Sequence, residues 1–285
     1  MKPQAESSGL AYAPNISWLL PELPFAQRPR AVAQAGFGAI EFGFPSHADL
    51  DALQAARADW GLEIVLFNQD VPVWDRNNRG YLVDPARGDE FRRTLDEALA
   101  IAARLAVQKI MLPAGVELPG LDRQLQRECM VERLCLAAGL AAQAGLLLTI
   151  EVLNPDDNPG YFLTSSAEAI DIVEQVNHPH VRFQMDTYHL QRLGGDLERT
   201  LRANGQTIGH IQFADEPGRH EPGSGSIDFA ALLRAAQAVG YRGYIGLEYV
   251  PQFPGTETLA WVPTHMRRLP PMWAQVMDSK QEKSR

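Results

Sequence analysis

The sequence contains little cysteine, since Cys129 and Cys135 are the two in 285 residues. They lie six positions apart in a stretch with helical apolar spacing, so they face different sides of the predicted helix and do not bond to each other there. A CxxC pair, which would indicate a zinc or redox site, is missing. We therefore expect two free, buried thiols rather than a disulfide framework.

Long apolar runs and an excess of basic residues are also lacking. No apolar segment approaches the roughly 18–20 residues that span a bilayer, and the opening MKPQAESSGL lacks the apolar core of a signal peptide. Lys and Arg number 26 against 35 Asp and Glu, a net charge of −9. Nucleic-acid-binding proteins normally have the opposite balance. The sequence predicts a soluble, cytoplasmic protein with neither a nucleic-acid nor a membrane partner.

The chain alternates regularly between two kinds of segment, one strand-like and one helix-like. Short runs of β-branched and aromatic residues predict strands at residues 11–18, 39–45, 63–68, 109–115, 146–154, 181–189, 208–215 and 244–250. Longer stretches with helical spacing include residues 47–61, 89–107, 122–145, 165–176 and 228–240. Several helical stretches end in a glycine, at Gly36, Gly61, Gly145 and Gly240.

Eight strand–helix units imply parallel strands joined by right-handed crossovers, in either a barrel or an open doubly wound sheet. The G-x-G-x-x-G that usually follows the first strand of an open sheet is missing here. We therefore predict an α/β fold, a single-domain (β/α)₈ TIM barrel over residues 10–262. Residues 1–9 would form an N-terminal tail and residues 263–285 a C-terminal helix or tail.

Polar residues end four consecutive predicted strands. In such a barrel the C-terminal ends of the strands form the active site. The four residues are Glu151, Asp186, Gln212 and Glu248. Three converging carboxylates repel one another unless a cation compensates, and an all-oxygen donor set suits Mg²⁺ or Mn²⁺. A single carboxylate at a strand end is often only a helix N-cap, but four at one level favour a metal site.

Two further segments carry polar side chains that could face a substrate. His189 follows Asp186 in what reads as a loop, where it would contact a substrate oxygen or serve as a metal ligand. Arg219, His220 and Glu221 follow the Gln212 strand, and an arginine at a barrel mouth suits a substrate carboxylate or hydroxyl. The nearby PGSGS could cradle a phosphate, but a flexible turn is the favoured interpretation.

At these residues the chain resembles a known family. The stretches IEVLNPDDNPGYFLTS, QMDTYHLQ, HIQFADEPGRHEPGSGSIDF and GLEYVP resemble hydroxypyruvate isomerases of the xylose-isomerase-like TIM-barrel superfamily. NISW, AIEFGFP, VLFN and RGYLVDPARGDEFR fit as well, so the resemblance covers roughly residues 10–262. It implies a (β/α)₈ barrel that interconverts hydroxypyruvate and tartronate semialdehyde and that can form homo-oligomers.

The resemblance also implies roles for individual residues. The metal ligands would be Glu151, Asp186, Gln212 and Glu248. Glu151 and Glu248 would double as the acid/base pair in proton transfer through an enediolate. The groups that contact the small sugar-acid substrate would be His189, Arg219, Asn68 and Glu221.

Two loops depart from the family pattern and leave the substrate open. Residues 69–85 read QDVPVWDRNNRGYLVDP, and Ser226 stands where the family often has Glu. A 2-oxo-tetronate isomerase is therefore an alternative, as is a ketose 3-epimerase, although those enzymes typically have His where this chain has Gln212. More remote alternatives are a non-catalytic sugar-acid-binding protein and a zinc nuclease, which would need more than the seven His present.

Overall fold

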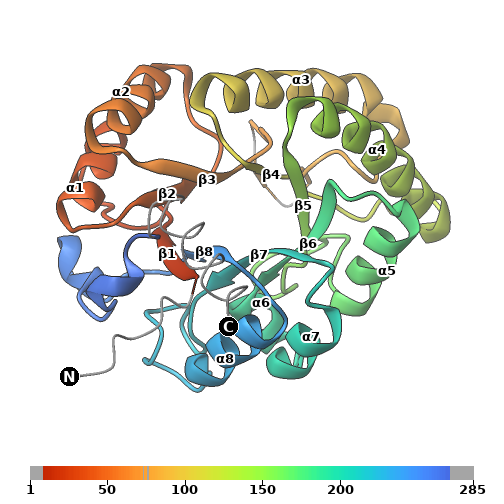
Figure 1. The fold of residues 1–285 in the computed structure, drawn as a ribbon. Helices are drawn as coiled ribbons and strands as arrows, with labels where there is room; N and C mark the ends of the chain where they lie inside the picture. The colour runs from red at the N-terminus through yellow and green to blue at the C-terminus, as the bar shows by residue number, and fades with distance from the viewer. Residues whose placement is uncertain (1–8, 73, 76, 270–285) are drawn as a thin grey trace, which may run out of the picture.

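The computed structural model describes residues 9–72, 74–75 and 77–269, which form a ring of parallel strands surrounded by helices (Figure 1). The strands are β1 Leu10–Pro14, β2 Ala39–Phe42, β3 Glu63–Asn68, β4 Lys109–Met111, β5 Leu147–Glu151, β6 Val181–Asp186, β7 Ile208–Phe213 and β8 Gly243–Leu247. Each predicted strand is present, and the single-domain (β/α)₈ barrel is confirmed.

The strands follow the order β1-β8-β7-β6-β5-β4-β3-β2, and every pair is parallel. The ring closes between β1 and β2 through one bridge, Asn15 with Glu41. There the N–H of Ile16 donates to the carbonyl oxygen of Glu41 at 2.8 Å. The seam of the barrel therefore lies at two polar residues.

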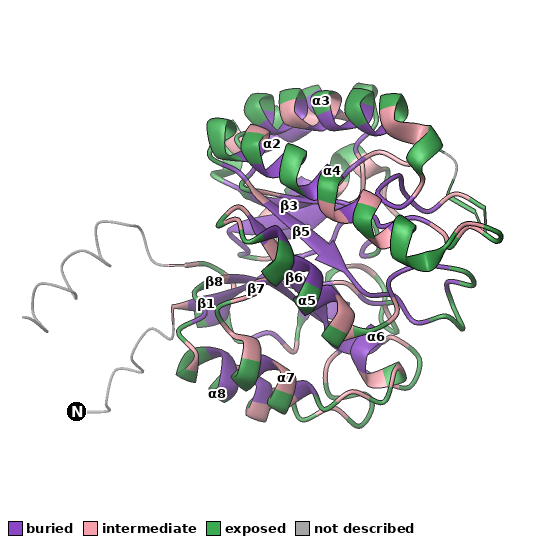
Figure 2. Ribbon diagram, turned by 90° about the vertical axis from the view of Figure 1, so that its right-hand side faces the viewer, coloured by how far each residue is buried: buried purple, intermediate pink, exposed green. Residues whose placement is uncertain are grey.

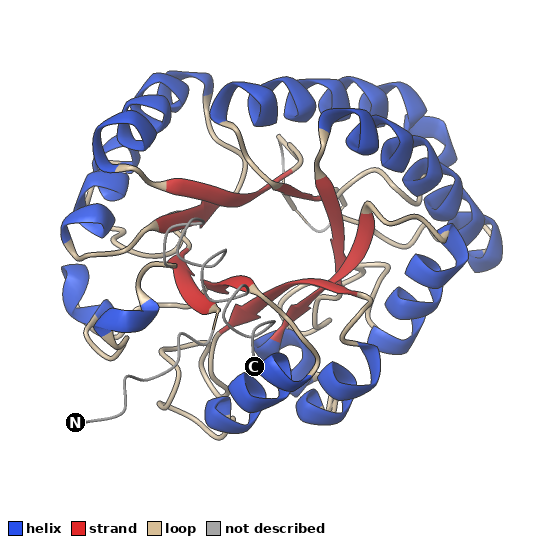
Figure 3. Cartoon of the chain, in the orientation of Figure 1, coloured by secondary structure: helices blue, strands red, loops and turns tan. Residues whose placement is uncertain are grey.

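Helices cover the outside of the ring (Figure 3). They are α1 Arg28–Gln34, α2 Leu50–Trp60, α3 Gly88–Leu105, α4 Arg123–Ala144, α5 Ser166–Val176, α6 Thr187–Arg192, α7 Leu197–Asn204 and α8 Phe229–Ala238. Short 3₁₀ helices span Phe25–Gln27, His47–Asp49, Pro85–Arg87, Gly255–Leu259 and Thr264–Met266. Gly61 and Gly145 end α2 and α4 in the left-handed conformation, as their sequence positions predict.

The segment after β6 corrects one expectation. His189 was expected in a loop, but α6 begins at Thr187. Asp186 causes this early start, because its side chain accepts from the N–H groups of Tyr188 and His189 and so caps the helix.

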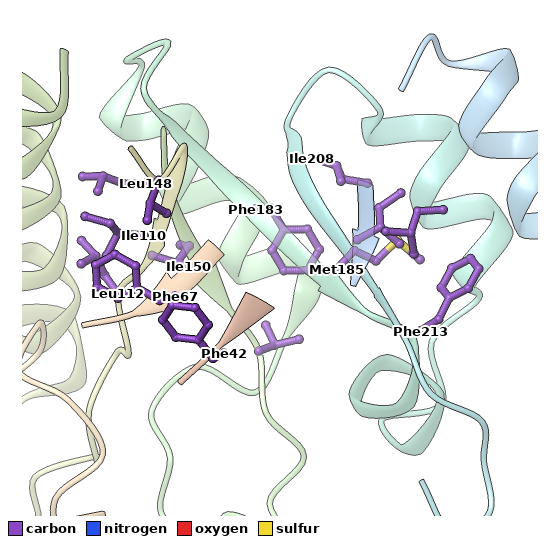
Figure 4. Packing of buried hydrophobic residues seen from close by; sticks show 14 of the residues in the cluster. Phe42, Phe67, Ile110, Leu112, Leu148, Ile150, Phe183, Met185, Ile208 and Phe213 are labelled. Carbon is purple, nitrogen blue, oxygen red and sulfur yellow. The ribbon is translucent and has the colours of Figure 1, made fainter. Parts of the chain in front are cut away.

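The apolar core lies between the strands and the helices, where both kinds of element turn their buried faces (Figures 2 and 4). Successive strand residues alternate between this core and the barrel interior. In β6, Phe183 and Met185 join the core, whereas Gln184 bonds to residues of β5 and β7 inside the barrel. This alternation aims the last polar residues of the strands at the axis.

Three remaining expectations concern cysteines, membranes and tails. Both cysteines are free, but Cys135 is exposed and Cys129 half-buried, so the expected burial is wrong. Among the described residues, none of the helices has the length and apolar character needed to cross a membrane. The predicted tails, 1–9 and 263–285, lie largely outside the described residues, and their boundaries stay predictions.

Candidate active site

The C-terminal ends of β5 to β8 bring the four predicted ligand residues together. Gln212 donates from Nε2 to Glu248 Oε2 at 2.8 Å. Gln184, between them and β5, donates from Nε2 to Gln212 Oε1 at 2.8 Å and to Glu151 Oε2 at 3.1 Å. Asp186 pairs with Gln212 in the strand register. We call Glu151, Asp186, Gln212 and Glu248 the mouth cluster.

Glu151 and Asp186 are buried and Glu248 is half-buried, and Arg219 is the cation that faces them among the described residues. Burial raises the pKa of Glu151 well above its ordinary value, and the charges of Asp186 and Glu248 raise it further. Burial also raises the pKa of Asp186 and of Glu248, against the lowering effect of Arg219. Glu151 Oε1 is buried with no hydrogen-bond partner among the described residues. Such a group is costly unless a cation or ligand completes it.

Asp186 combines the two roles that the sequence left open. Its Oδ1 accepts from the backbone N–H of Tyr188 at 2.7 Å and of His189 at 3.2 Å. Its Oδ2 faces the guanidinium of Arg219 at 3.3 Å. The carboxylate is thus a helix cap through one oxygen and a member of the mouth cluster through the other.

His189 is held as a neutral hydrogen-bond donor. Its Nδ1 accepts from the backbone N–H of Asn154 at 3.2 Å and lies 2.9 Å from the Asn154 side-chain nitrogen, so its proton is assigned to Nε2. Burial, and then the charge of Arg219, lower the pKa of His189 well below its usual value. Ligand atoms of Glu151, Asp186 and His189 lie within 4.8 Å of one another. A protonated Nε2 suits a substrate oxygen rather than a metal ion.

Arg219 faces the mouth cluster from the loop after β7. Its Nη2 donates to Glu248 Oε1 at 2.5 Å, and its guanidinium lies 4.3 Å from the ring of Trp18 and 5.2 Å from that of Tyr188. Its backbone has a φ of 57°, in the left-handed region. The rings and the carboxylates together orient the guanidinium.

Asp215 holds the loop that carries Arg219. Its buried carboxylate accepts from the backbone N–H groups of Gly223 at 2.8 Å, Gly225 at 2.9 Å and Ile227 at 3.1 Å. The glycine amides of PGSGS are therefore directed at a side chain of the protein. This supports the interpretation of PGSGS as a turn rather than a phosphate cradle.

Two predicted rim residues lie apart from the mouth cluster. Asn68 ends β3 and pairs with Met111, on the far side of the ring from β7. Glu221 is buried, and its Oε1 accepts from Thr258 Oγ1 at 2.5 Å and from the N–H of Gln252 at 2.9 Å. Its contacts hold the segment after β8, although its Oε2 is buried without a hydrogen-bond partner in the described part of the chain.

Sequence reasoning missed a second group of titratable residues deeper in the barrel, in which Glu41 and His210 are buried and Lys109 is half-buried. Glu41 Oε2 lies 2.7 Å from His210 Nε2, and His210 Nδ1 lies 3.2 Å from Lys109 Nζ. Glu41 Oε1 accepts from Gln212 at 2.7 Å and from Asn15 at 3.2 Å. We call Glu41, His210 and Lys109 the interior network.

Gly246 makes room for the interior network. A Cβ at this position would lie 2.3 Å from Glu41 Oε2, so the absence of a side chain on β8 lets the carboxylate cross the barrel. Asn15 then links the two groups, because its Nδ2 also donates to Glu248 Oε2 at 2.9 Å. The only sequence signals were a Glu inside the apolar run AIEFGFP and a glycine inside YIGLEYV.

Comparisons with known proteins agree with this architecture. The family model described as xylose isomerase-like TIM barrel matches residues 29–269. The hydroxypyruvate isomerase of Escherichia coli K12 is 34% identical over 253 residues, covering 89% of this chain and 98% of the relative. The 2-oxo-tetronate isomerase of Cupriavidus necator is 35% identical over 257 residues, covering 90% and 99%.

One solved structure is also close. A crystal structure from Brucella melitensis, described as an AP endonuclease of family 2, is 37% identical, with a TM-score of 0.84. The match covers 88% of this chain and 97% of that one.

Proposed function

The chain belongs to the xylose isomerase-like TIM barrel family, in its hydroxypyruvate isomerase group, and is an isomerase; we propose that its substrate is a small sugar acid. The reaction proposed first is the interconversion of hydroxypyruvate and tartronate semialdehyde. The observation that carries this proposal is the mouth cluster, in which two glutamates from β5 and β8 meet with a buried, unpartnered oxygen on Glu151.

The mouth cluster fits a hard divalent cation. Its oxygen donors would be three carboxylates and the Gln212 amide oxygen, which also accepts from Gln184. The raised pKa values of the carboxylates follow from burial without enough positive charge. Glu151, Asp186, Gln212 and Glu248 would hold Mg²⁺ or Mn²⁺. When bound, the ion would supply positive charge that polarises the substrate carbonyl and stabilises an enediolate.

Glu151 and Glu248 are proposed to move the proton. Isomerisation removes a proton from the carbon beside the carbonyl and returns one to the former carbonyl carbon, so the two substrate carbons exchange oxidation states without an external oxidant. The two glutamates come from strands separated by β6 and β7, which allows them to flank a substrate. Glu151 Oε1, free of protein partners among the described residues, is available to carry a proton.

His189 and Arg219 are proposed to hold the substrate oxygens. The Nε2–H of His189 is aimed toward Asp186, whose Oδ2 lies 4.0 Å away, a gap that leaves this donor free for a ligand. Arg219 is anchored between two rings and two carboxylates. Both groups would fix the oxygens of the substrate while the glutamates exchange protons.

A substrate panel tests this function. Hydroxypyruvate, 2-oxo-tetronates and free ketohexoses would be incubated with the protein and Mg²⁺ or Mn²⁺, with and without EDTA, and followed by NMR in D₂O. We expect turnover of hydroxypyruvate that requires the metal and that brings deuterium onto the carbon beside the carbonyl. No turnover of any of these compounds would overturn the proposal.

A 2-oxo-tetronate isomerase is the second candidate. It is favoured by the unusual sequence of residues 69–85, whose described part, 69–72, 74–75 and 77–85, follows the C-terminal end of β3. The panel separates the two candidates, because this alternative predicts turnover of the longer acids alone.

Gln212 argues against a ketose 3-epimerase. The net charge of −9 argues against a nucleic-acid substrate, and a cytoplasmic location and homo-oligomer formation stay predictions.

A further inference from the structure

Arg79, in the loop after β3, is a buried guanidinium that forms no ion pair among the described residues, although the charge of Asp75 acts on it. Its side chain is 7% exposed, and burial lowers its pKa. Among the described residues its one hydrogen-bond partner is the neutral side-chain oxygen of Asn158, and its Nε is buried with no partner. A buried cation in this condition is costly unless an anion completes it.

Three other arginines of the barrel have more partners than Arg79, and the half-buried Arg57 of α2 also has an Nε without a hydrogen-bond partner among the described residues. Arg87, in the same loop, also stacks on an aromatic ring and also bonds to an asparagine. However, it forms two hydrogen bonds to the carboxylate of Glu90, at 2.6 and 2.9 Å. Arg133 and Arg267 each donate to two or more backbone carbonyl oxygens. Arg79 therefore differs from Arg87, Arg133 and Arg267 in having one neutral hydrogen-bond partner among the described residues.

The backbone fixes Arg79 at the mouth end of the barrel. The next residue, Gly80, forms a bridge with Ala114 just beyond β4. Gly80 has a φ of 125°, and a Cβ there would lie 2.1 Å from the carbonyl oxygen of Pro113. Only glycine permits this close approach, so the chain at Arg79 is held against the end of β4.

The partner of Arg79 connects it to the candidate active site. Asn158 lies in the loop after β5, and its N–H donates to the carbonyl oxygen of Asn154 at 3.1 Å. Asn154 in turn holds His189. Arg79 thus lies in the wall formed by the loops after β3 and β5, while the mouth cluster occupies β5 to β8.

We propose that the Arg79 guanidinium binds the carboxylate of the substrate and so selects sugar acids over neutral sugars of the same length. This inference rests on the proposed function. With a divalent ion bound, the three carboxylates of the mouth cluster, the ion and Arg219 would sum to zero charge, and Arg219 is already engaged by Glu248 and Asp186, so none of these groups offers a spare positive charge to a substrate carboxylate. A second cation is needed, and the planar fork of an arginine matches a carboxylate.

The test compares Arg79→Met and Arg79→Lys with the matched control Arg87→Met from the same loop. Each full-length variant is assayed with hydroxypyruvate and with dihydroxyacetone, which has a neutral CH₂OH in place of the carboxylate. We expect Arg79→Met to lower kcat/KM for hydroxypyruvate about 10²-fold, mainly through KM, and to change dihydroxyacetone turnover less than about 3-fold. Arg79→Lys should recover part of the loss, and Arg87→Met should leave the ratio of the two substrates unchanged.

Calorimetric binding of glycerate and glycerol separates this inference from the proposed function. If wild type turns over neither substrate, the proposed function fails, but glycerate binding that is weakened by Arg79→Met would still support the Arg79 site. Equal losses for hydroxypyruvate and dihydroxyacetone would make Arg79 merely structural and overturn the inference. Glycerate binding that is absent in wild type, or unchanged in Arg79→Met, would overturn it as well.

Discussion

The mouth cluster and the interior network are both groups of buried or half-buried titratable residues in one barrel. They differ in whether their charged atoms have hydrogen-bond and charge partners within the protein. In the interior network each oxygen of Glu41 has a hydrogen-bond partner, and His210 joins it to the positive charge of Lys109. In the mouth cluster three carboxylates share Arg219, and Glu151 Oε1 has no partner among the described residues. Satisfied buried charges organise a structure, whereas unsatisfied ones indicate a place where a ligand can bind.

The comparison predicts opposite consequences of mutation in the two groups. Glu151→Gln and Glu248→Gln should each lower kcat at least about 10²-fold, because each would remove one of the two proposed proton-transfer groups. The Tm of the metal-free protein should stay equal or rise, because one of three repelling charges is lost. Steady-state kinetics and thermal unfolding in EDTA measure both effects. Activity near wild type in either variant would contradict the assigned role.

Filling the interior network should reduce stability instead. Gly246→Ala places a methyl group against the Glu41 carboxylate, 2.3 Å from Oε2, and should cost about 3 kcal/mol of unfolding free energy through overpacking. The matched control is Gly139→Ala, in the middle of α4, where a Cβ meets nothing within 4 Å. This control should gain about 0.5–1 kcal/mol. Urea denaturation compares the two, and equal stabilities would refute a tightly filled barrel interior.

The interior network should also make stability depend on pH. Burial lowers the pKa of Lys109 from 10.5 to about 8, so between these values the unfolded chain binds more protons than the folded chain. Stability due to Lys109 therefore rises with pH in this window, by about 2 kcal/mol between pH 8 and 9.5. Lys109→Met should lack this rise in urea denaturation of the metal-free protein. An identical pH profile for the variant and wild type would contradict the assignment.

The same comparison explains what the sequence could predict. Glu151 and Asp186 end apolar runs, so the strand pattern could predict that their side chains lie at the C-terminal end of the barrel. Glu41 and Lys109 lie in runs that read as ordinary strands, and their burial depends on ring closure at Asn15 and on the space beside Gly246. These are contacts between residues far apart in the chain.

The paths of the loops were the second feature that the sequence could not predict. His189 was placed correctly after its strand but not in a helix, because the capping role of Asp186 could not be distinguished from a ligand role. Glu221 follows Arg219 by two residues, yet it turns to Thr258 while Arg219 turns to Glu248. Sequence proximity to a functional residue did not decide which side chain reaches the mouth.

The most direct test of the account is a Mn²⁺ titration of the metal-free protein, followed by calorimetry. It would compare wild type with Asp186→Asn in the mouth cluster and with Glu117→Gln, whose carboxylate lies in an exposed ion pair with Arg123. We expect one tight Mn²⁺ site in wild type, an affinity at least about 10-fold lower in Asp186→Asn, and no change in Glu117→Gln. Absence of Mn²⁺ binding by wild type, or equal affinity in Asp186→Asn, would contradict it.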